Sequence, residues 1–377
     1  MEEKPLTYEI VDSIERIPRG EWDAVCGDLP EGYDFHRAIE LAAPPGFSFF
    51  YALVADRRRL LAVAPLFICD FELDIPLAGA AGALIRRVRK NVRRFCVART
   101  LFCGSPFGER GLIGVRPGVA DRDAVVGEIL RAMDGFSRAR RVPFIVFKDF
   151  TEEDAALLAP LLRRGFARVP GLPNVVTDLD APTFDGYLAA LSRATRKDVR
   201  RKVKKALVEA RVRVEIAGDV APIADEIYRL YCNTWGSGGA RFGKLTREFF
   251  AAAGGTLGPG AKFFLYRADG RLAAFNLCIA HGDLLLDKFI GFDYDISRAH
   301  NLYFVSWFCN IEWCLEHGIR RYQSGQNGYG PKLRLGGRRV PLYAYLRHRN
   351  PLADRAIKAA ARRASSSVPG AGRGGRK

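Results

Sequence analysis

The stretch from Phe263 to Ile279 reads FFLYRADGRLAAFNLCI and decides the fold. Two apolar runs flank a turn at Gly270-Arg271, which is typical of a β-hairpin. The same layout occurs earlier, where residues 50–67 read FYALVADRRRLLAVAPLF and the first run again ends in Ala-Asp. A spacing of about half the chain favours a duplication over a solenoid of short repeats. The alternative is a chance likeness between two amphipathic hairpins.

A helical pattern and then a strand follow each hairpin, over residues 124–138 and 143–147 and again over residues 302–317 and 319–322. Gly171-Leu-Pro173 interrupts the pattern between the copies. We therefore predict two α/β (α+β) halves, residues 1–173 and 174–350. Residues 351–377 form a basic tail in which 353–364 has a helical pattern. We expect this tail to be disordered, because its end is low in complexity.

Composition indicates a folded, two-domain protein. The chain has 377 residues, of which 48% are hydrophobic and 27% charged. Its eight cysteines contain no Cys-x-x-Cys pair, which favours buried, reduced thiols. The N-terminus lacks a signal-type apolar core, and no apolar run is long enough to span a membrane. We expect a cytoplasmic protein, or one at the inner face of the membrane.

The net charge of +17 is concentrated in three segments. Residues 86–94, 193–213 and 353–377 are strongly basic, and the remainder of the chain is slightly acidic. Local basicity suggests anionic partners such as phosphates, nucleic acid or a membrane surface. The segment 85–95 mixes basic and apolar residues, so it could rest on a membrane or cover a cleft. The alternative is that these segments are solvated helix faces.

The basic run from Ser192 to Ala210 places Val199, Val203 and Leu207 on one helical face, with Arg196 and Arg200 on a neighbouring stripe. This run resembles the helix that opens the second domain of Fem-type peptidyl aminoacyl transferases. It also resembles related GNAT proteins of the cellulose-biosynthesis-like acetyltransferase group. The resemblance implies two tandem GNAT-like domains, each a mixed, mostly antiparallel sheet flanked by helices. Arg196 and Arg200 become candidates for binding the acceptor.

The run from Asp287 to Arg334 resembles the core of a GNAT domain, in which a strand pairs with the acyl donor and a helix N-terminus receives the donor's phosphates. The resemblance places Phe289, Ile290 and Gly291 on the donor strand. Arg298, His300 and Asn301 would lie at the helix start. The glycine-rich loop usual in GNAT proteins is missing between Ser297 and Asn301, which keeps aminoacyl-tRNA open as the donor.

The closing motif of the same family implies that Lys332 is catalytic, since a fixed positive charge stabilises a developing oxyanion. The alternative is an ordinary surface lysine. Candidates for the general base are Asp293, Tyr294, Asp295 and Tyr329, none of which the spacing singles out. The remaining candidates for binding substrate are Tyr294, Gln326 and Asn327.

Several other chemistries are not indicated. The five histidines have no partners at metal-ligand spacing, so we predict no metal. The chain contains no P-loop, no G-x-G-x-x-G after a strand and no nucleophile elbow, so nucleotide hydrolysis, dinucleotide redox chemistry and serine hydrolysis are not expected.

The leading prediction is an N-acyltransferase that moves an acyl group from acyl-CoA, such as acetyl-CoA, to an amine in cell-envelope or polysaccharide metabolism. The acceptor would be a small or lipid-linked anionic molecule. A Fem-type aminoacyltransferase that uses tRNA is the first alternative. A non-catalytic protein that binds nucleic acid or an anionic membrane is the second.

Overall fold

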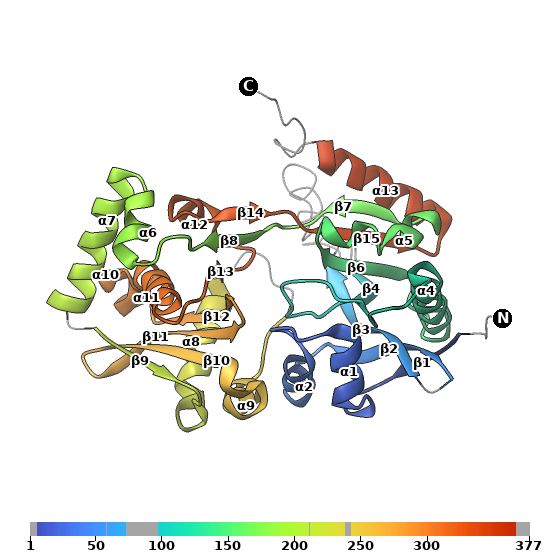
Figure 1. Ribbon diagram of the computed structural model, residues 1–377, viewed down its shortest axis with the longest axis horizontal. Coiled ribbons are helices and arrows are strands. Elements are labelled where there is room, and N and C mark those ends of the chain that lie inside the picture. Colours follow the sequence, from blue (N-terminus) through green and yellow to red (C-terminus); the bar gives the residue numbers. More distant parts are fainter. Residues whose placement is uncertain (1–5, 58, 73–96, 211, 238–242, 367–377) are drawn as a thin grey trace. The chain divides into compact units, whose positions relative to one another are not determined.

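The computed structural model describes residues 6–57, 59–72, 97–210, 212–237 and 243–366 (Figure 1). Its contacts divide the chain into two compact units. Unit 1 comprises Met1–Gly27, Gly46–Leu172 and Pro341–Lys377, and unit 2 comprises Asp28–Pro45 and Pro173–Val340. One division between the units falls between Leu172 and Pro173, and neither unit is continuous in sequence. Residues 28–45 belong with the second half, and residues 341–350 belong with the first.

The sheet of unit 1 is antiparallel except for one parallel pair, β4 with β6. Its strand order is β1-β2-β3-β4-β6-β15-β7, with β5 beside β3. The strand β15 comes from the predicted C-terminal half and pairs with β6 and β7 on its two edges, which explains why it belongs to unit 1. The strands are β1 (Thr7–Val11), β2 (Ser48–Asp56), β3 (Arg59–Glu72), β4 (Val97–Cys103), β5 (Gly114–Val115), β6 (Phe144–Phe150), β7 (Ala167–Pro170) and β15 (Tyr343–His348).

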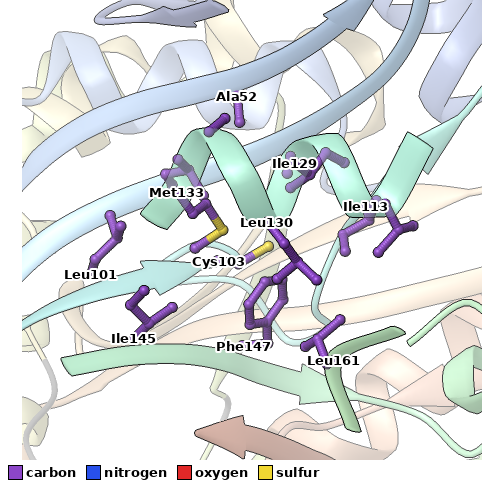
Figure 2. Packing of buried hydrophobic residues seen from close by; sticks show 14 of the residues in the cluster. Ala52, Leu101, Cys103, Ile113, Ile129, Leu130, Met133, Ile145, Phe147 and Leu161 are labelled. Atoms are coloured by element: carbon purple, nitrogen blue, oxygen red, sulfur yellow. The ribbon is translucent and has the colours of Figure 1, made fainter. Parts of the chain in front are cut away.

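The long helix α4 (Arg122–Ala139) covers one face of this sheet. The side chain of Asp121 caps its first turn by accepting from the backbone N–H of Ala124 at 2.8 Å. Figure 2 shows Ile129, Leu130 and Met133 of α4 packed among residues of the strands. The other helical segments of unit 1 are η1 (Ile14–Arg16), α1 (Arg19–Cys26), η2 (Glu153–Ala155), α5 (Ala159–Arg163) and α13 (Pro351–Ser366).

The start of the predicted disordered tail is helical. Residues 351–366 form α13, which lies against β7 and β15 in unit 1. The carboxylate of Asp354 accepts a hydrogen bond from the backbone N–H of His348 at 2.9 Å and ties the helix to β15. The prediction of disorder is therefore corrected for these residues, because the sheet of unit 1 gives the helix a surface to pack on. Residues 367–377 lie outside the described residues, as does the basic segment 85–95.

The sheet of unit 2 repeats the pattern, with β12 and β13 as its parallel pair. Its strand order is β14-β8-β13-β12-β11-β10-β9. The predicted hairpin is present, and its turn places Asp269 and Gly270 at φ values of 50° and 76°. The strands are β8 (Asn174–Asp178), β9 (Arg213–Ala217), β10 (Ala261–Ala268), β11 (Arg271–His281), β12 (Leu284–Phe292), β13 (Arg321–Gln323) and β14 (Arg338–Val340).

Helices cover both faces of this sheet (Figure 1). On one face α11 (Leu302–Glu316) packs with α6 (Phe184–Ala190) and α7 (Arg193–Val203). On the other face α8 (Ala224–Ser237) and α9 (Arg247–Leu257) meet α2 (Tyr33–Leu41). The remaining segments are the π-helix η3 (Lys204–Glu209), η4 (Ala221–Ile223), η5 (Gly258–Gly260), α10 (Tyr294–His300) and α12 (Tyr329–Arg334).

The predicted fold class is confirmed. Each unit is an α/β (α+β) structure in which a mixed, mostly antiparallel sheet is flanked by helices. The described cysteines are all free thiols. None of the helices in the described ranges is long and apolar enough to cross a membrane. The same ranges contain no cluster of potential metal-binding side chains.

Candidate active site

The strand β12 separates from β13 part-way along its length. Leu284, Leu285 and Leu286 pair with β13, but β12 continues for six more residues, Asp287 to Phe292. No strand among the described residues pairs with this part of its outer edge. In unit 1, by contrast, β4 is paired with β6 up to its last residue. Unpaired backbone N–H and C=O groups on an exposed strand edge can pair with an extended ligand.

A β-bulge lies where the two strands separate. Leu277 on β11 faces Phe289, and the next residue, Cys278, faces Asp287, so Lys288 is the extra residue. A bulge of this kind bends a strand and redirects its side chains. Further along, the side chains of Asn233 and Thr234 on α8 hydrogen-bond the backbone C=O and N–H of Phe292, at 3.0 and 3.2 Å. The open edge is therefore limited to the residues between the bulge and Phe292.

The carboxylate of Asp287 lies at this point and is the centre of a buried hydrogen-bond network. The hydroxyl of Tyr322 on β13 donates to it at 2.7 Å, and the amide of Asn276 on β11 donates to both of its oxygens, at 3.1 and 3.3 Å. The amide of Asn310 on α11 donates to the same Tyr322 hydroxyl at 3.1 Å. Each partner comes from a different element, so only the folded unit 2 brings them together.

Burial raises the pKa of Asp287 above its ordinary value. The hydrogen bonds from Tyr322 and Asn276, and the positive charges of Lys332 and Lys288, act in the opposite direction. Asp287 is half-buried as a whole residue and lies beside the open edge of β12. A raised pKa at a carboxyl group in this position is the property expected of a proton acceptor in catalysis.

Lys332 on α12 lies close to this network and is not a surface lysine, because only 8% of it is exposed. Its ammonium group donates to the backbone carbonyls of Ser324 and Gly325 in the turn after β13. Gly328, with φ at 69°, leaves space for it, since an added Cβ there would lie 3.9 Å from Lys332 Cε and 3.3 Å from the hydroxyl of Tyr303. Tyr303 is in the first turn of α11, and burial with the nearby charge of Asp287 raises its pKa to about 12.

Residues 193–332 match the model of the acetyltransferase (GNAT) domain family. Unit 2 contains a GNAT acetyltransferase domain. The matched range begins at α7 and ends at Lys332, so it includes the separated strands and the network around Asp287. No match was found among curated proteins.

Several solved structures are similar over nearly the whole chain. FemX superposes with a TM-score of 0.56 at 12% identity, covering 93% of this chain and 100% of FemX. The C-terminal domain of a putative lysylphosphatidylglycerol synthetase from Agrobacterium fabrum gives 0.54 at 12% identity, covering 95% and 98%. A tandem GNAT protein from the clavulanic acid biosynthesis pathway gives 0.53 at 16% identity, covering 92% and 99%. The similarity therefore shows the tandem GNAT fold. Because the identities are low, it shows nothing beyond the fold.

Three of the residues predicted to bind the donor lie on one strand of the GNAT domain. Phe289, Ile290 and Gly291 are all on β12. Phe289 packs against aromatic residues of α8 and α9, and an added Cβ at Gly291 would lie 2.6 Å from backbone of α8. Successive residues of a strand direct their backbone N–H and C=O groups to opposite edges. Ile290 lies two residues before Phe292, so its N–H and C=O groups point to the open edge. The side chain of Phe289 and the lack of one at Gly291 therefore serve packing, and the backbone of Ile290 is the candidate contact.

The residues predicted to lie at one helix start are divided between two helices, α10 and α11. Arg298 and His300 lie in the short α10, and Asn301, with φ at 55°, ends α10 and begins α11. The helix α10 thus takes the place expected for the glycine-rich phosphate loop. Arg298 is exposed and lies 5.3 Å from the ring of Tyr294. The roles of these residues in binding a donor stay predictions.

A hollow of about 540 Å³ opens beside the end of β12. The carboxylate of Asp293 lies in its wall, 3.6 Å from a guanidinium nitrogen of Arg229 and 3.7 Å from one of Arg271. These two guanidinium groups balance its charge, so Asp287 is the better placed carboxylate for proton transfer. The residues around the hollow are Arg229, Asn233, Gly236, Asp293, Tyr294 and Asp295.

Three of the predicted residues near the closing motif lie around the turn that Lys332 holds. Gln326 and Asn327 follow β13, and Asn327 is exposed. The hydroxyl of Tyr329 donates to the carbonyl of Pro173 at 2.9 Å. That bond fixes α12 to the segment before β8. Tyr329 therefore has a structural contact, and its predicted catalytic role, like the binding roles of Gln326 and Asn327, stays a prediction.

The two arginines predicted to bind the acceptor are on α7, and both have partners. The guanidinium of Arg196 donates to carbonyls at the end of α6, at 3.0 Å for Ala189 and 3.4 Å for Leu188 and Leu191. Arg200 pairs with Asp185 at 3.1 Å and is exposed. Arg196 therefore closes a helix end, and its binding role, like that of Arg200, stays a prediction.

The bulged residue Lys288 forms a buried ion pair with Glu31, which comes from the N-terminal segment of unit 2. Their side chains are only 1% and 13% exposed. The ammonium group also lies 5.0 Å from the ring centre of Phe35 on α2. This pair anchors the bulge from the face of the sheet opposite to Asp287. It explains physically why residues 28–45 belong to unit 2.

Sequence reasoning missed the network around Asp287, although part of its signal was visible. Asp287 follows three leucines in an apolar strand, and Asn276 interrupts the apolar run of β11. A polar residue inside each of two adjacent buried strands indicates a hydrogen-bonded pair. No sequence pattern connects them to Tyr322, Asn310 or Tyr303.

Proposed function

We propose that unit 2 is an N-acyltransferase that moves an acyl group from acyl-CoA to an amine. The observation that carries this proposal is the open edge of β12 beside the carboxylate of Asp287. An extended donor can add to the edge as a further strand, with the backbone of Ile290 hydrogen-bonding its amide groups. Its reactive carbonyl would then lie near the bulge, next to Asp287.

In this proposal Asp287 accepts the proton of the attacking amine. The amine nitrogen forms a bond to the carbonyl carbon, the C–S bond of the thioester breaks, and the thiolate leaves. Tyr322 and Asn276 hold the carboxylate in place. Lys332 supplies a fixed positive charge near the carbonyl oxygen, where negative charge accumulates during transfer.

The main alternative is an aminoacyl-tRNA donor, and α10 is the observation that favours it. A GNAT phosphate loop offers backbone N–H groups to the pyrophosphate of CoA. This position instead carries the short helix α10, whose N-cap is Asp293 and whose second residue is Asp295. Carboxylates repel phosphates, although Arg229 and Arg271 offset Asp293. The open edge supports either donor, because both carry an acyl group on an extended arm.

The nature of the acceptor is also a proposal. One structural neighbour is named for lysylphosphatidylglycerol, a lipid that carries an amino acid. That name supports a lipid-linked, anionic acceptor of the cell envelope. The basic surface of α7 supports the same class of acceptor, since exposed cations attract phosphates.

The proposed chemistry is tested with Asp287→Asn, which keeps the shape of the side chain and removes its charge. The matched control is Asp283→Asn in the β11–β12 turn, where the aspartate pairs with exposed Arg321. With acetyl-CoA and a panel of amines, we expect Asp287→Asn to lower kcat at least about a hundred-fold, with little change in the control. Equal activity of the two variants would contradict the role of Asp287.

The donor is tested by titration calorimetry with acetyl-CoA, longer acyl-CoAs and aminoacyl-tRNA. Arg298→Ala removes the exposed cation of α10, and Asn301→Gly removes a side chain while keeping the left-handed backbone. Micromolar binding of a CoA ester that both variants weaken supports the acyl-CoA proposal. Binding of aminoacyl-tRNA alone supports the alternative donor. If no donor binds, the protein is not a transferase and the non-catalytic alternative gains support.

A further inference from the structure

The helix α7 and the π-helix η3 present a row of exposed cations. Arg193, Lys197 and Arg201 are spaced by four residues and are exposed, and Lys204 and Lys205 continue the row into η3. This row is about 18 Å long at the rise of an α-helix. The opposite face is fixed in the core of unit 2, where Val199 is 2% and Ala206 0% exposed.

Most of this charge is not neutralised. Residues 193–209 contain eight basic and two acidic residues. Asp198 pairs with Arg201 and Lys202, and Glu209 lies 4.0 Å from Lys204. Within the described ranges, no ion pair is found for Arg193, Lys197 or Lys205. These three cations are therefore available to an anionic partner.

Exposed apolar residues follow the basic row directly. Val208 in η3 is 66% exposed, and Val214 and Ile216 on β9 are 36% and 44% exposed. The strand β9 is at the edge of the sheet, and Val214 and Ile216 face Tyr266 and Phe264 in register. They therefore point to the face of the sheet that α7 and α11 cover. Three of the nine large apolar residues that are exposed in the described ranges lie within these nine positions.

We propose that α7, η3 and β9 form a surface that binds an anionic phospholipid bilayer. Cations beside a cluster of aliphatic side chains suit the boundary between charged headgroups and acyl chains. A nucleic acid would satisfy the cations but would leave the valines and the isoleucine in water, and its stacked bases usually require aromatic partners. The ring of Phe304 on α11, beside α7, is not free to stack on a base, because the ammonium group of Lys202 lies 3.5 Å from its centre.

The surface contains none of the residues around Asp287, so binding to vesicles can be measured apart from acyl transfer, although the proposed acceptor class rests on the same basic helix. If unit 2 is a transferase, binding of this surface to a bilayer would bring its site close to lipid-linked amines. The exposed position of these residues also means that they can be changed without disturbing the core.

The test is co-sedimentation of the full chain with vesicles of phosphatidylcholine alone and of phosphatidylcholine with 30% phosphatidylglycerol. One variant removes the three available cations with Arg193→Gln, Lys197→Gln and Lys205→Gln. Each cation near an anionic surface contributes about five-fold in affinity, so we expect roughly a hundred-fold weaker binding. The control is a triple variant of exposed cations in unit 1, with Arg57→Gln, Arg59→Gln and Arg122→Gln. It has the same net charge and should bind as the natural protein does.

A second variant, Val208→Ser with Ile216→Thr, leaves every charge in place. We expect about ten-fold weaker binding to the anionic vesicles, and we expect the effect to persist in 0.5 M salt, where electrostatic attraction is screened. Circular dichroism melting curves identify any variant that does not fold.

Three results would overturn the proposal. In the first, both triple variants bind the anionic vesicles equally well. In the second, binding disappears in salt and the apolar variant behaves as the natural protein does, which indicates attraction to any polyanion. In the third, the protein binds tRNA but no vesicle.

Discussion

Replacing Tyr322 by phenylalanine removes one hydroxyl group from the centre of the network. That hydroxyl donates to the Asp287 carboxylate at 2.7 Å and accepts from Asn310 at 3.1 Å, and Tyr322 is 1% exposed. A hydrogen bond to a charged group contributes about 1.5–3 kcal/mol, and a neutral one about 1 kcal/mol. With Asp287 charged, we expect Tyr322→Phe to lower the free energy of unfolding by about 3 kcal/mol.

The loss should depend on pH because of the carboxyl group. The hydroxyl of Tyr322 lowers the pKa of Asp287 and so opposes the effect of burial. In Tyr322→Phe the pKa of Asp287 therefore rises further. A carboxyl group with a raised pKa in the folded state contributes stability at low pH, and this contribution is lost as pH rises through the raised value. The stability difference between the two proteins should grow from about 1 kcal/mol at acidic pH to about 3 kcal/mol at neutral pH.

Tyr187→Phe is the matched control. Tyr187 is also buried, donates to the carbonyl of Leu335 at 2.6 Å and accepts from the indole of Trp307 at 3.2 Å, and among the described residues no carboxylate hydrogen-bonds to it. We expect a loss of about 1–2 kcal/mol that does not change with pH.

The assay is urea unfolding between pH 4.5 and pH 8, followed by tryptophan fluorescence. Three of the four tryptophans are in unit 2, and Trp307 packs edge-on against Tyr322 at 4.9 Å, so the signal reports mainly on this unit. If Tyr322→Phe gives a pH-independent loss equal to that of Tyr187→Phe, the hydroxyl does not stabilise a charged Asp287, and the reasoning is refuted.

Three further predictions concern the same unit, and all are measured by urea unfolding. Asp287→Asn should raise the free energy of unfolding at pH 7, because it removes a charge whose burial is unfavourable; a loss of stability would contradict the raised pKa. Lys288→Met and Glu31→Gln should each lower the free energy of unfolding by about 3–5 kcal/mol, because each leaves a buried charge without its partner. The double variant Lys288→Met with Glu31→Met should lose far less than the sum of the two, and additive losses would show that the ion pair is not coupled. Gly291→Ala should cost at least about 1–3 kcal/mol, because its Cβ would lie 2.4 Å from the ring of Phe275 and 2.6 Å from the backbone of α8; an unchanged midpoint would show that α8 can move away.

Much of the fold could be predicted from the sequence because its signals are local. The hairpins of β2 with β3 and of β10 with β11 depend on neighbouring residues and on turn chemistry. The helix α11 begins at Leu302 as predicted and ends before Gly318, whose φ of 70° stops it. These features need only short-range periodicity and the conformational freedom of glycine.

The boundaries of the two units could not be predicted, because they depend on pairing between distant segments. Apolar alternation predicts that Tyr343–His348 is a strand, but not that it pairs with β6 and β7. The same limit applies to Glu31, whose partner Lys288 is 257 positions away. An acidic residue in a loop has no local feature that identifies such a partner.

The duplicated α/β halves, the likeness to GNAT proteins and the position of Lys332 in the closing motif are all visible in the chain before folding. The burial of Lys332, the separation of β12 from β13 after three residues, and the meeting of Asp287 with Tyr322 become visible only in the folded unit. Hydrophobic periodicity and turn residues act over a few positions, so they are visible in the chain. A proton acceptor depends on burial and on hydrogen bonds among residues of four separate elements, and those exist only after the sheet and its helices have packed.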